Sequence, residues 1–166
     1  MSQTQVARAV RNLNWVHATA QKLTQSWPDD KALHQNTPTE NHLLWTMGHL
    51  ASTYDWFRTL IAGGEMIVPE AYYKTLFGYG SKPHKHAAEY PAIAEVRSYF
   101  DKCYAAFVAA AEKLSDADAH LPCVGDSHGM AADRLEVIDR VAWHDGWHSG
   151  QLAGLRKSLG LPSVTG

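Results

Sequence analysis

The sequence predicts an all-α fold, a four-helix bundle with a long connection between the second and third helices. Four long stretches carry apolar residues at spacings of three and four, the period of one face of an α-helix. No stretch alternates between apolar and polar residues as half-buried β-strands do. A chain of 166 residues favours a single domain over residues 1–166, which can bury most of its apolar surface without disulfides.

The first helix is predicted over residues 5–27. Pro28 ends it, because proline lacks the backbone N–H that a helix interior needs. Its apolar stripe consists of Val6, Val10, Leu13, Val16 or His17, Ala20 and Leu23.

The second helix is predicted over residues 38–62, and its start is strongly marked. Thr37 can cap the helix, Pro38 suits the first helical position, and Glu40 completes a capping box. Gly63 follows the last helical residue and ends the helix. The main apolar stripe consists of Leu43, Met47, Leu50, Tyr54, Phe57 and Ile61.

The rest of the chain alternates connections with helices. Residues 63–90 form a long connection, and such segments usually act as lids or hold short helices, here predicted over 70–77. The third long helix is predicted over residues 91–114, and a second loop over 115–130. The fourth helix follows over residues 131–159, where a glycine and a proline just beyond it mark the end.

The fourth helix carries His144 and His148 in an H-x-x-x-H pattern. This i, i+4 spacing puts two imidazoles on one helix face, about one turn apart. Both continue the inward apolar stripe, and a buried polar side chain is costly unless it has a partner. A shared transition-metal ion is one such partner, because three neutral nitrogens and an exchangeable water form a known catalytic site. A chance spacing within an ordinary core is the alternative.

His49 is the best candidate for a third ligand. It lies on the flank of the apolar arc of the second helix, so it can face the bundle interior or a groove beside it. A single histidine there is more often structural, but the histidine pair in the fourth helix favours a ligand. The sequence therefore predicts one divalent metal ion held by His49, His144 and His148. Zinc, nickel and iron are all compatible with such a ligand set.

Other polar residues rank below these three. His17 could lie on the inner stripe of its helix, and His42 is expected to be a partly exposed helix residue. Asp145 directly follows a candidate ligand, but adjacent helical residues point about 100° apart, so we expect a surface charge. The loop histidines are expected to face solvent: His84, His86, His120 and His128.

Tryptophans near the candidate ligands offer a second site prediction. Trp45, Trp56 and Trp147 are candidates for lining a pocket beside the metal, and plain core packing is the alternative. We expect the metal to keep one open coordination position that faces this pocket, with residues 63–90 covering part of it.

A row of glycines recurs every fourth residue in the fourth helix: Gly146, Gly150 and Gly154. Each glycine costs a helix up to about 1 kcal/mol relative to alanine. The row lies nearly opposite the histidines, so it predicts close helix contact, either with a second subunit or within the monomer.

The composition argues against several functional classes, and a DNA-binding module ranks third among the functional hypotheses. A net charge of −2 gives no electrostatic footprint for nucleic acid. The sequence contains no run of about 18 apolar residues, so no membrane span is expected. The N-terminus lacks the pattern of a signal peptide. Two cysteines occur, Cys103 and Cys123, and a disulfide between them is the alternative to the reduced, cytoplasmic setting that we expect.

Two motifs stand out, W-x-x-G-H-L from Trp45 and H-x-x-x-H-S-G-Q-L from His144. With these motifs the chain resembles the DinB-like superfamily, also called the DinB/YfiT-like metalloenzymes. The trailing L-R-x-x-L-G-L-P from Leu155 also fits, and the resemblance covers nearly the whole chain in helix order and spacing.

The resemblance implies a four-helix bundle, a divalent metal ion held by three histidines, and often a homodimer. Characterised members include transferases and isomerases that use a low-molecular-weight thiol such as bacillithiol, mycothiol or glutathione. The sequence departs from the family at Ser149, where many members carry arginine.

The leading expectation is a metal-dependent transferase that acts on a small molecule with such a thiol. Its metal would favour the thiolate form of the thiol. A hydrolase is an alternative, in which the metal lowers the pKa of bound water toward about 7. No glutamate follows His144 in an H-E-x-x-H pattern, which excludes a zinc protease. The other alternative is a non-catalytic stress protein that binds a metal or another ligand.

Overall fold

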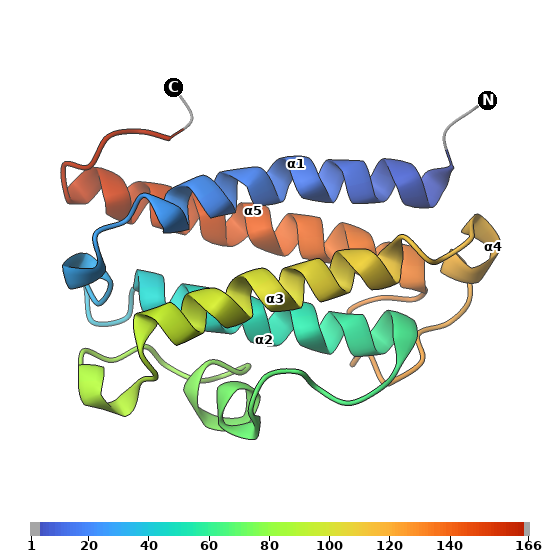
Figure 1. The fold of residues 1–166 in the computed structure, drawn as a ribbon, viewed down its shortest axis with the longest axis horizontal. Coiled ribbons are helices and arrows are strands. Elements are labelled where there is room, and N and C mark those ends of the chain that lie inside the picture. Colours follow the sequence, from blue (N-terminus) through green and yellow to red (C-terminus); the bar gives the residue numbers. More distant parts are fainter. Residues whose placement is uncertain (1–3, 165–166) are drawn as a thin grey trace.

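The computed structural model describes residues 4–164, in which four long helices form a bundle: α1 (Gln5–Gln25), α2 (Leu43–Ala62), α3 (Ile93–Ala111) and α5 (Arg134–Ser158). They lie side by side, with α1 against α5 and α2 against α3 (Figure 1). No strand occurs within residues 4–164. The all-α prediction and the helical bundle are confirmed.

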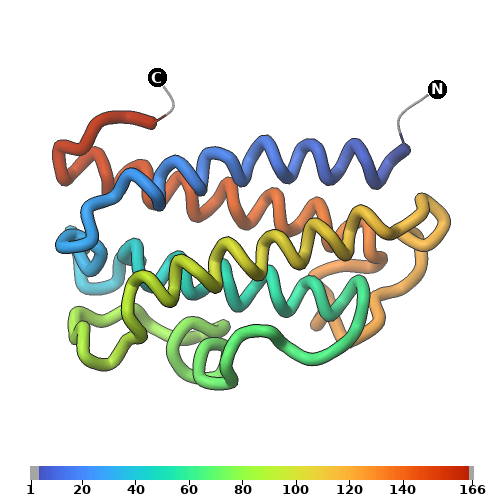
Figure 2. The backbone as a smooth tube through the Cα atoms, viewed as in Figure 1, coloured from blue at the N-terminus to red at the C-terminus, as the bar shows by residue number. Residues whose placement is uncertain are grey.

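The direction of each helix explains the connections between them. α1 and α5 run one way, and α2 and α3 run the other way (Figure 2). Because α2 and α3 are parallel, residues 63–92 return the chain along the length of the bundle. This segment holds η2 (Tyr72–Leu76), a single π-helical turn inside the predicted 70–77 helix, and η3 (Ala87–Glu89). The link between α1 and α2 holds η1 (Asp29–Lys31).

The start of α2 differs from the prediction. The Thr37 cap does not form, and α2 begins at Leu43, where the imidazole of His42 caps it by accepting the backbone N–H of Trp45 at 3.1 Å. Glu40 instead accepts a backbone N–H of the preceding turn at 2.6 Å. The expectation that His42 is partly exposed was also wrong, because its side chain is fully buried.

The other helix ends lie close to their predicted positions. α1 ends before Trp27, and α5 begins after Asp133, whose carboxylate caps it by accepting the N–H of Glu136 at 2.8 Å. The predicted loop 115–130 contains the single-turn helix α4 (Asp116–Ala119). The largest fully buried side chains come from α1, α2, α3 and the segment after α2: Tyr54, Tyr72, Phe57, Phe77, Phe100, Phe107, Leu13, Leu23, Leu43, Met47, Leu50 and Leu60.

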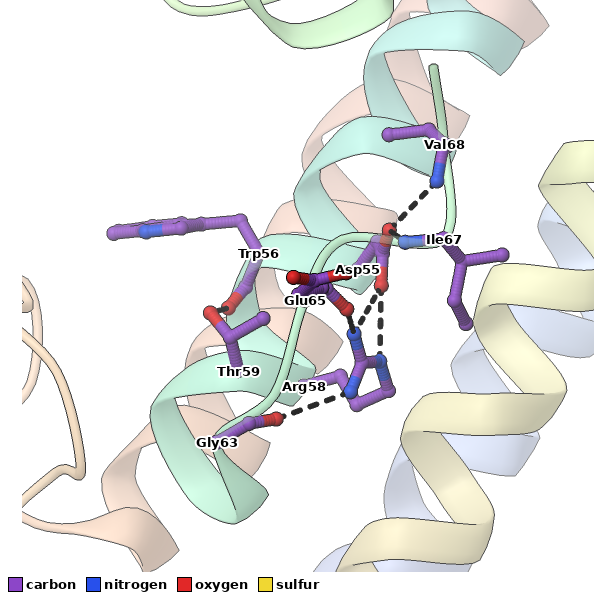
Figure 3. Close-up of polar contacts among 8 residues, drawn as sticks. All are labelled: Asp55, Trp56, Arg58, Thr59, Gly63, Glu65, Ile67 and Val68. Carbon is purple, nitrogen blue, oxygen red and sulfur yellow. Dashed lines mark hydrogen bonds and ion pairs between the residues drawn. The ribbon is translucent and has the colours of Figure 1, made fainter. Parts of the chain in front are cut away.

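A buried carboxylate holds the beginning of this segment against α2 (Figure 3). Asp55 is fully buried and accepts the backbone N–H groups of Ile67 and Val68, the latter at 2.9 Å. Arg58 donates to the same carboxylate at 2.9 Å and to the carbonyl of Gly63 at 3.2 Å. The chain beyond α2 is thereby fixed in place before it reaches the histidines.

A second buried network joins α1, α2 and α5. Asp145 is fully buried, which contradicts its prediction as a surface charge. Its carboxylate accepts the hydroxyl of Tyr54 and lies 2.8 Å from Nδ1 of His17, whose ring stacks on Tyr104. The helical turn of about 100° per residue points Asp145 toward α1 while His144 faces α2. His17 is therefore a partner of Asp145.

The two cysteines are free thiols. Cys103 lies in the core, where burial raises the pKa of its thiol to about 12. A thiol in that state is an inert packing residue rather than a nucleophile. Within residues 4–164, no helix combines the length and the apolar character needed to cross a membrane.

Candidate metal centre

Three imidazoles meet where α2 faces α5. The Nε2 atom of His144 lies 3.3 Å from Nε2 of His49 and 3.1 Å from Nε2 of His148. One ring nitrogen of each histidine lies within 4.8 Å of those of the other two. No other cluster of three or more histidine, cysteine, aspartate or glutamate side chains in residues 4–164 has this spacing. The structure thus brings the three predicted ligands together.

The separations between these nitrogens suit a single metal ion. Zinc–nitrogen bonds of about 2.0–2.1 Å at tetrahedral angles place ligand nitrogens ~3.3 Å apart. The observed separations of 3.1 and 3.3 Å agree with that value. The donor set fits a borderline-soft divalent ion, since all three ligands are imidazoles.

His49 is oriented by a backbone carbonyl. Its Nδ1–H donates to the carbonyl oxygen of Phe77 at 2.7 Å. Because a carbonyl can only accept, the proton is fixed on Nδ1 and the Nε2 lone pair is free for a metal. Gly48 makes this contact available, since a Cβ there would lie 2.5 Å from the ring of Phe77. The glycine of the W-x-x-G-H motif therefore admits the segment that positions the ligand.

The two ligands on α5 are held differently. Nδ1 of His148 lies 2.9 Å from the amide oxygen of Gln151, one turn further along the helix. The same oxygen accepts from Nδ2 of Asn41 at 3.2 Å. Nδ1 of His144 is buried and has no hydrogen-bond partner among the described residues. A metal ion would therefore be the principal constraint on the ring of His144.

Burial keeps the three imidazoles neutral. It lowers the pKa of His144 to about 2 and the pKa of His148 to about 4, with the neighbouring imidazoles adding to both shifts. Burial likewise lowers the pKa of His49, and the hydrogen bond that its Nδ1–H donates to the carbonyl of Phe77 opposes this shift. Metal binding requires neutral imidazoles, so no proton competes for these nitrogens near neutral pH.

Trp45 forms one wall of the centre. Its indole lies parallel to the ring of His49, with 4.6 Å between centroids, and is 6.4 Å from the ring of His148. Its Nε1–H donates to the hydroxyl of Ser81 at 3.1 Å. Residues 63–92 therefore reach the centre twice, through Phe77 and through Ser81.

The other two predicted pocket residues lie in different surroundings. Trp147 is 56% exposed and packs against Trp143 at 5.4 Å. Trp56 packs against Phe57 and stacks on His128. Two surface hollows of about 320 and 360 Å³ lie elsewhere, beside the N-terminal half of α1 and at its C-terminal end. A pocket lined by all three tryptophans remains a prediction.

Sequence reasoning missed the groups that orient the ligands. Gln151 lies three residues after His148, a spacing that shares one helix face, and this signal could have identified it. Asn41 and the carbonyl of Phe77 come from distant segments that no local pattern connects to the histidines. His84 and His86 do not join the centre; the carbonyl of His84 instead lies 3.0 Å from Nε2 of His42.

Comparison with known families identifies one match. The model of the DinB superfamily matches residues 12–152, a span that contains all three histidines and most of the bundle. No curated protein matches the chain.

Proposed function

The chain belongs to the DinB superfamily, and we propose that it is a metal-dependent enzyme of the low-molecular-weight-thiol transferase type. In this proposal, His49, His144 and His148 hold one divalent ion and leave one coordination position open. The observation that carries the proposal is the convergence of three Nε2 atoms at 3.1 and 3.3 Å. Zinc, nickel and iron are all compatible with such ligands.

The chemistry divides between the ion and the chain. When bound, the ion would favour the thiolate form of a coordinated thiol, which is the nucleophile for a small electrophilic substrate. The chain's part is orientation: Phe77 and Gln151 hold two of the ligands, and the indole of Trp45 offers an apolar surface beside them. The segment that carries Phe77 and Ser81 would cover part of the open position.

Thiol transfer is favoured over hydrolysis because no general base accompanies the histidines. Asp145 adjoins His144 in sequence, but its carboxylate is occupied by His17 and Tyr54 in the core. No carboxylate within residues 4–164 joins the three-histidine cluster. Activation of water by a bound ion usually relies on such a base, whereas a coordinated thiol is activated by the ion itself.

Metal analysis followed by an activity screen tests this proposal. Purified protein should contain about one equivalent of a divalent transition metal, and His148→Ala prepared in parallel should contain none. The loaded protein is then assayed with a panel of thiols and electrophiles, and separately with model esters and amides. Thiol-dependent turnover supports the proposal. Ester or amide hydrolysis would indicate the hydrolase, and a loaded but inert protein would indicate non-catalytic binding.

We also propose that the protein forms a homodimer through the outer face of α5. Residues at alternating spacings of four and three form a seam on this face: Glu136, Arg140, Trp143, Trp147, Gly150, Gly154 and Lys157. Such spacing is typical of helices that pack along their length. Every residue of this α5 seam except Glu136 is exposed, and Glu136 is half-buried. The seam therefore lies outside the bundle core.

The central part of the α5 seam, from Trp143 to Gly154, is complementary to itself in shape. If two copies pack antiparallel about a twofold axis between Trp147 and Gly150, each tryptophan of the seam meets a glycine of the other copy. At each end Arg140 would face Lys157, and the charge of Arg140 is paired with Glu136 at 2.6 Å. A Cβ on Gly150 or Gly154 would contact nothing within 4 Å in the monomer. Packing within the monomer therefore does not explain these two glycines, whereas a Cβ on Gly146 would meet Val16 of α1 at 3.8 Å.

A further inference from the structure

A short chain of polar side chains connects the start of α2 to the metal centre. Asn41 precedes the cap of α2, and its Nδ2 donates to Oε1 of Gln151 at 3.2 Å. The same oxygen accepts Nδ1–H of His148 at 2.9 Å. One atom of Gln151 therefore serves two donors, one from each neighbouring side chain.

This chain has two self-consistent polarities. In the one that the structure adopts, the oxygen of Gln151 lies toward both neighbours. Because an amide oxygen can only accept, His148 then carries its proton on Nδ1, and its Nε2 lone pair faces the other histidines. In the reverse polarity, the amide nitrogen of Gln151 would donate both to Asn41 and to Nδ1 of His148. His148 would then carry its proton on Nε2, which lies 3.1 Å from Nε2 of His144. Only the observed polarity leaves His148 able to bind a metal.

We infer that Asn41 and Gln151 are positioning residues that hold the proton of His148 on Nδ1 and so keep its Nε2 available as a ligand. This inference rests on the proposed metal site and extends it to residues beyond the three histidines. Groups that orient ligand histidines in this way typically affect metal affinity by about 10–100-fold.

The three ligands differ in the hydrogen-bond partner of Nδ1. A backbone carbonyl orients His49, and no side-chain substitution can reverse a carbonyl. His144 has no partner for its Nδ1 among residues 4–164. Only His148 depends on two replaceable side chains, so the effect of polarity can be tested there by substitution alone.

The test compares two substitutions that change charge equally but act oppositely on the proton. Gln151→Glu places an acceptor beside Nδ1 of His148 and keeps the observed polarity. Asn41→Asp removes the donor that selects the oxygen of Gln151, so the amide reverses and donates to both neighbours. Gln151→Leu removes the hydrogen bond altogether, and circular dichroism checks that every variant is folded.

The main measurement is the position of the proton in metal-free protein. Long-range proton–nitrogen NMR on histidine-labelled, chelator-treated full-length chain distinguishes the two imidazole tautomers at about pH 8, above the ordinary imidazole pKa. The signal of His148 is assigned by its loss in His148→Gln. We expect the Nδ1–H tautomer in the wild type and in Gln151→Glu, and mainly the Nε2–H tautomer in Asn41→Asp.

Zinc affinity, measured by competition with a chromophoric chelator, is the second readout. We expect Gln151→Glu to bind zinc at least as tightly as the wild type, and Gln151→Leu to bind about 10–100-fold more weakly. The inference is overturned if Asn41→Asp and Gln151→Glu show the same tautomer, or if Gln151→Leu binds zinc with wild-type affinity. If the wild type binds no metal while the tautomers behave as expected, the proposed function fails and the positioning role stands.

Discussion

At the scale of single residues, the metal centre depends on three neutral imidazoles whose Nε2 atoms converge. Nδ1 of His49 and of His148 each have a hydrogen-bond partner, whereas Nδ1 of His144 has none among the described residues. Replacing His148 with alanine removes one ligand together with its bond to Gln151. We expect this variant to lose metal binding while it keeps its helix content, because core packing carries most of the stability at this chain length. Metal analysis and circular dichroism on the same sample provide the measurement. A globally unfolded variant would mean that the ion is structural.

Gly48 and Gly150 form a matched pair of helical glycines: a neighbouring segment packs tightly against the first and not against the second. In Gly48→Ala, the new Cβ would lie 2.5 Å from the ring of Phe77, so Phe77 and its carbonyl must move away from His49. We expect a loss of about 1–3 kcal/mol in unfolding free energy, as for other overpacked cores, together with weaker metal binding. In Gly150→Ala the Cβ meets nothing within 4 Å.

We expect Gly150→Ala to raise the unfolding free energy of the monomer by up to about 1 kcal/mol and to leave metal affinity unchanged. Both glycine variants are compared in a Trp147→Glu background, so that the proposed dimer does not contribute to either value. Urea unfolding and zinc competition on both variants separate the two outcomes. Equal zinc affinities for the two variants would show that the contact between Phe77 and His49 does not matter for the site.

The sequence predicted the three ligands because their spacing reports directly on helix geometry. His144 and His148 share a face by periodicity alone, and His49 was selected by its place on the flank of an apolar arc. The groups that orient the ligands through hydrogen bonds could not be predicted in the same way. The carbonyl of Phe77 is 28 positions from His49, and Asn41 is 110 positions from Gln151, so both contacts depend on tertiary packing.

At the scale of elements, the start of α2 shows why local signals can mislead. The capping-box residues are present, but Glu40 bonds to the preceding turn and His42 caps the helix instead. Tertiary packing selects this start, because the ring of His42 is enclosed and packs edge-on against Tyr90. A helix cap that is also a fully buried histidine couples the stability of α2 to pH.

Burial lowers the pKa of His42 from 6.5 to about 4, and the hydrogen bond that its Nε2–H donates to the carbonyl of His84 opposes this shift. Between these values the unfolded chain binds more protons than the folded protein, so folding is favoured by higher pH. The contribution is fully present above about pH 6.5 and is lost as the pH falls toward 4, with about 2 kcal/mol lost by pH 5.

His42→Asn keeps a good helix cap but removes the titration. We expect its unfolding free energy to fall less than that of the wild type between about pH 7.5 and 5. Urea unfolding at the two pH values measures the difference between the proteins, in which the contributions of the metal-site histidines cancel. Equal pH dependence in both proteins would show that folding does not lower the pKa of His42.

At the scale of the whole molecule, buried polar contacts connect the helix pairs. His17, Tyr54 and Asp145 come from three different helices and meet in the core. His17→Leu would leave the carboxylate of Asp145 buried without its nitrogen partner, at a cost of about 3–5 kcal/mol. Asp145→Asn removes the charge and keeps an acceptor for the hydroxyl of Tyr54.

We therefore expect the double variant His17→Leu, Asp145→Asn to be more stable than His17→Leu alone. Urea unfolding of the wild type, the two single variants and the double variant gives the coupling free energy between the two side chains. Additive effects would mean that the two residues contribute independently. The network was missed from sequence because a helix can bury two adjacent residues when neighbouring helices cover both directions.

The proposed dimer is tested through the α5 seam. Trp147 is 56% exposed and lies at the centre of the seam, beside Gly150. If two copies pack there, Trp147→Glu places a charge against the second copy and should convert a dimer into a monomer without loss of helix content. Sedimentation velocity at micromolar concentration measures the change.

Tyr79→Glu is the control, because Tyr79 is a fully exposed aromatic residue outside α5. A wild-type protein that sediments as a monomer would refute the dimer. Equal effects of the two substitutions would indicate nonspecific association through exposed aromatic residues rather than a dimer through the α5 seam.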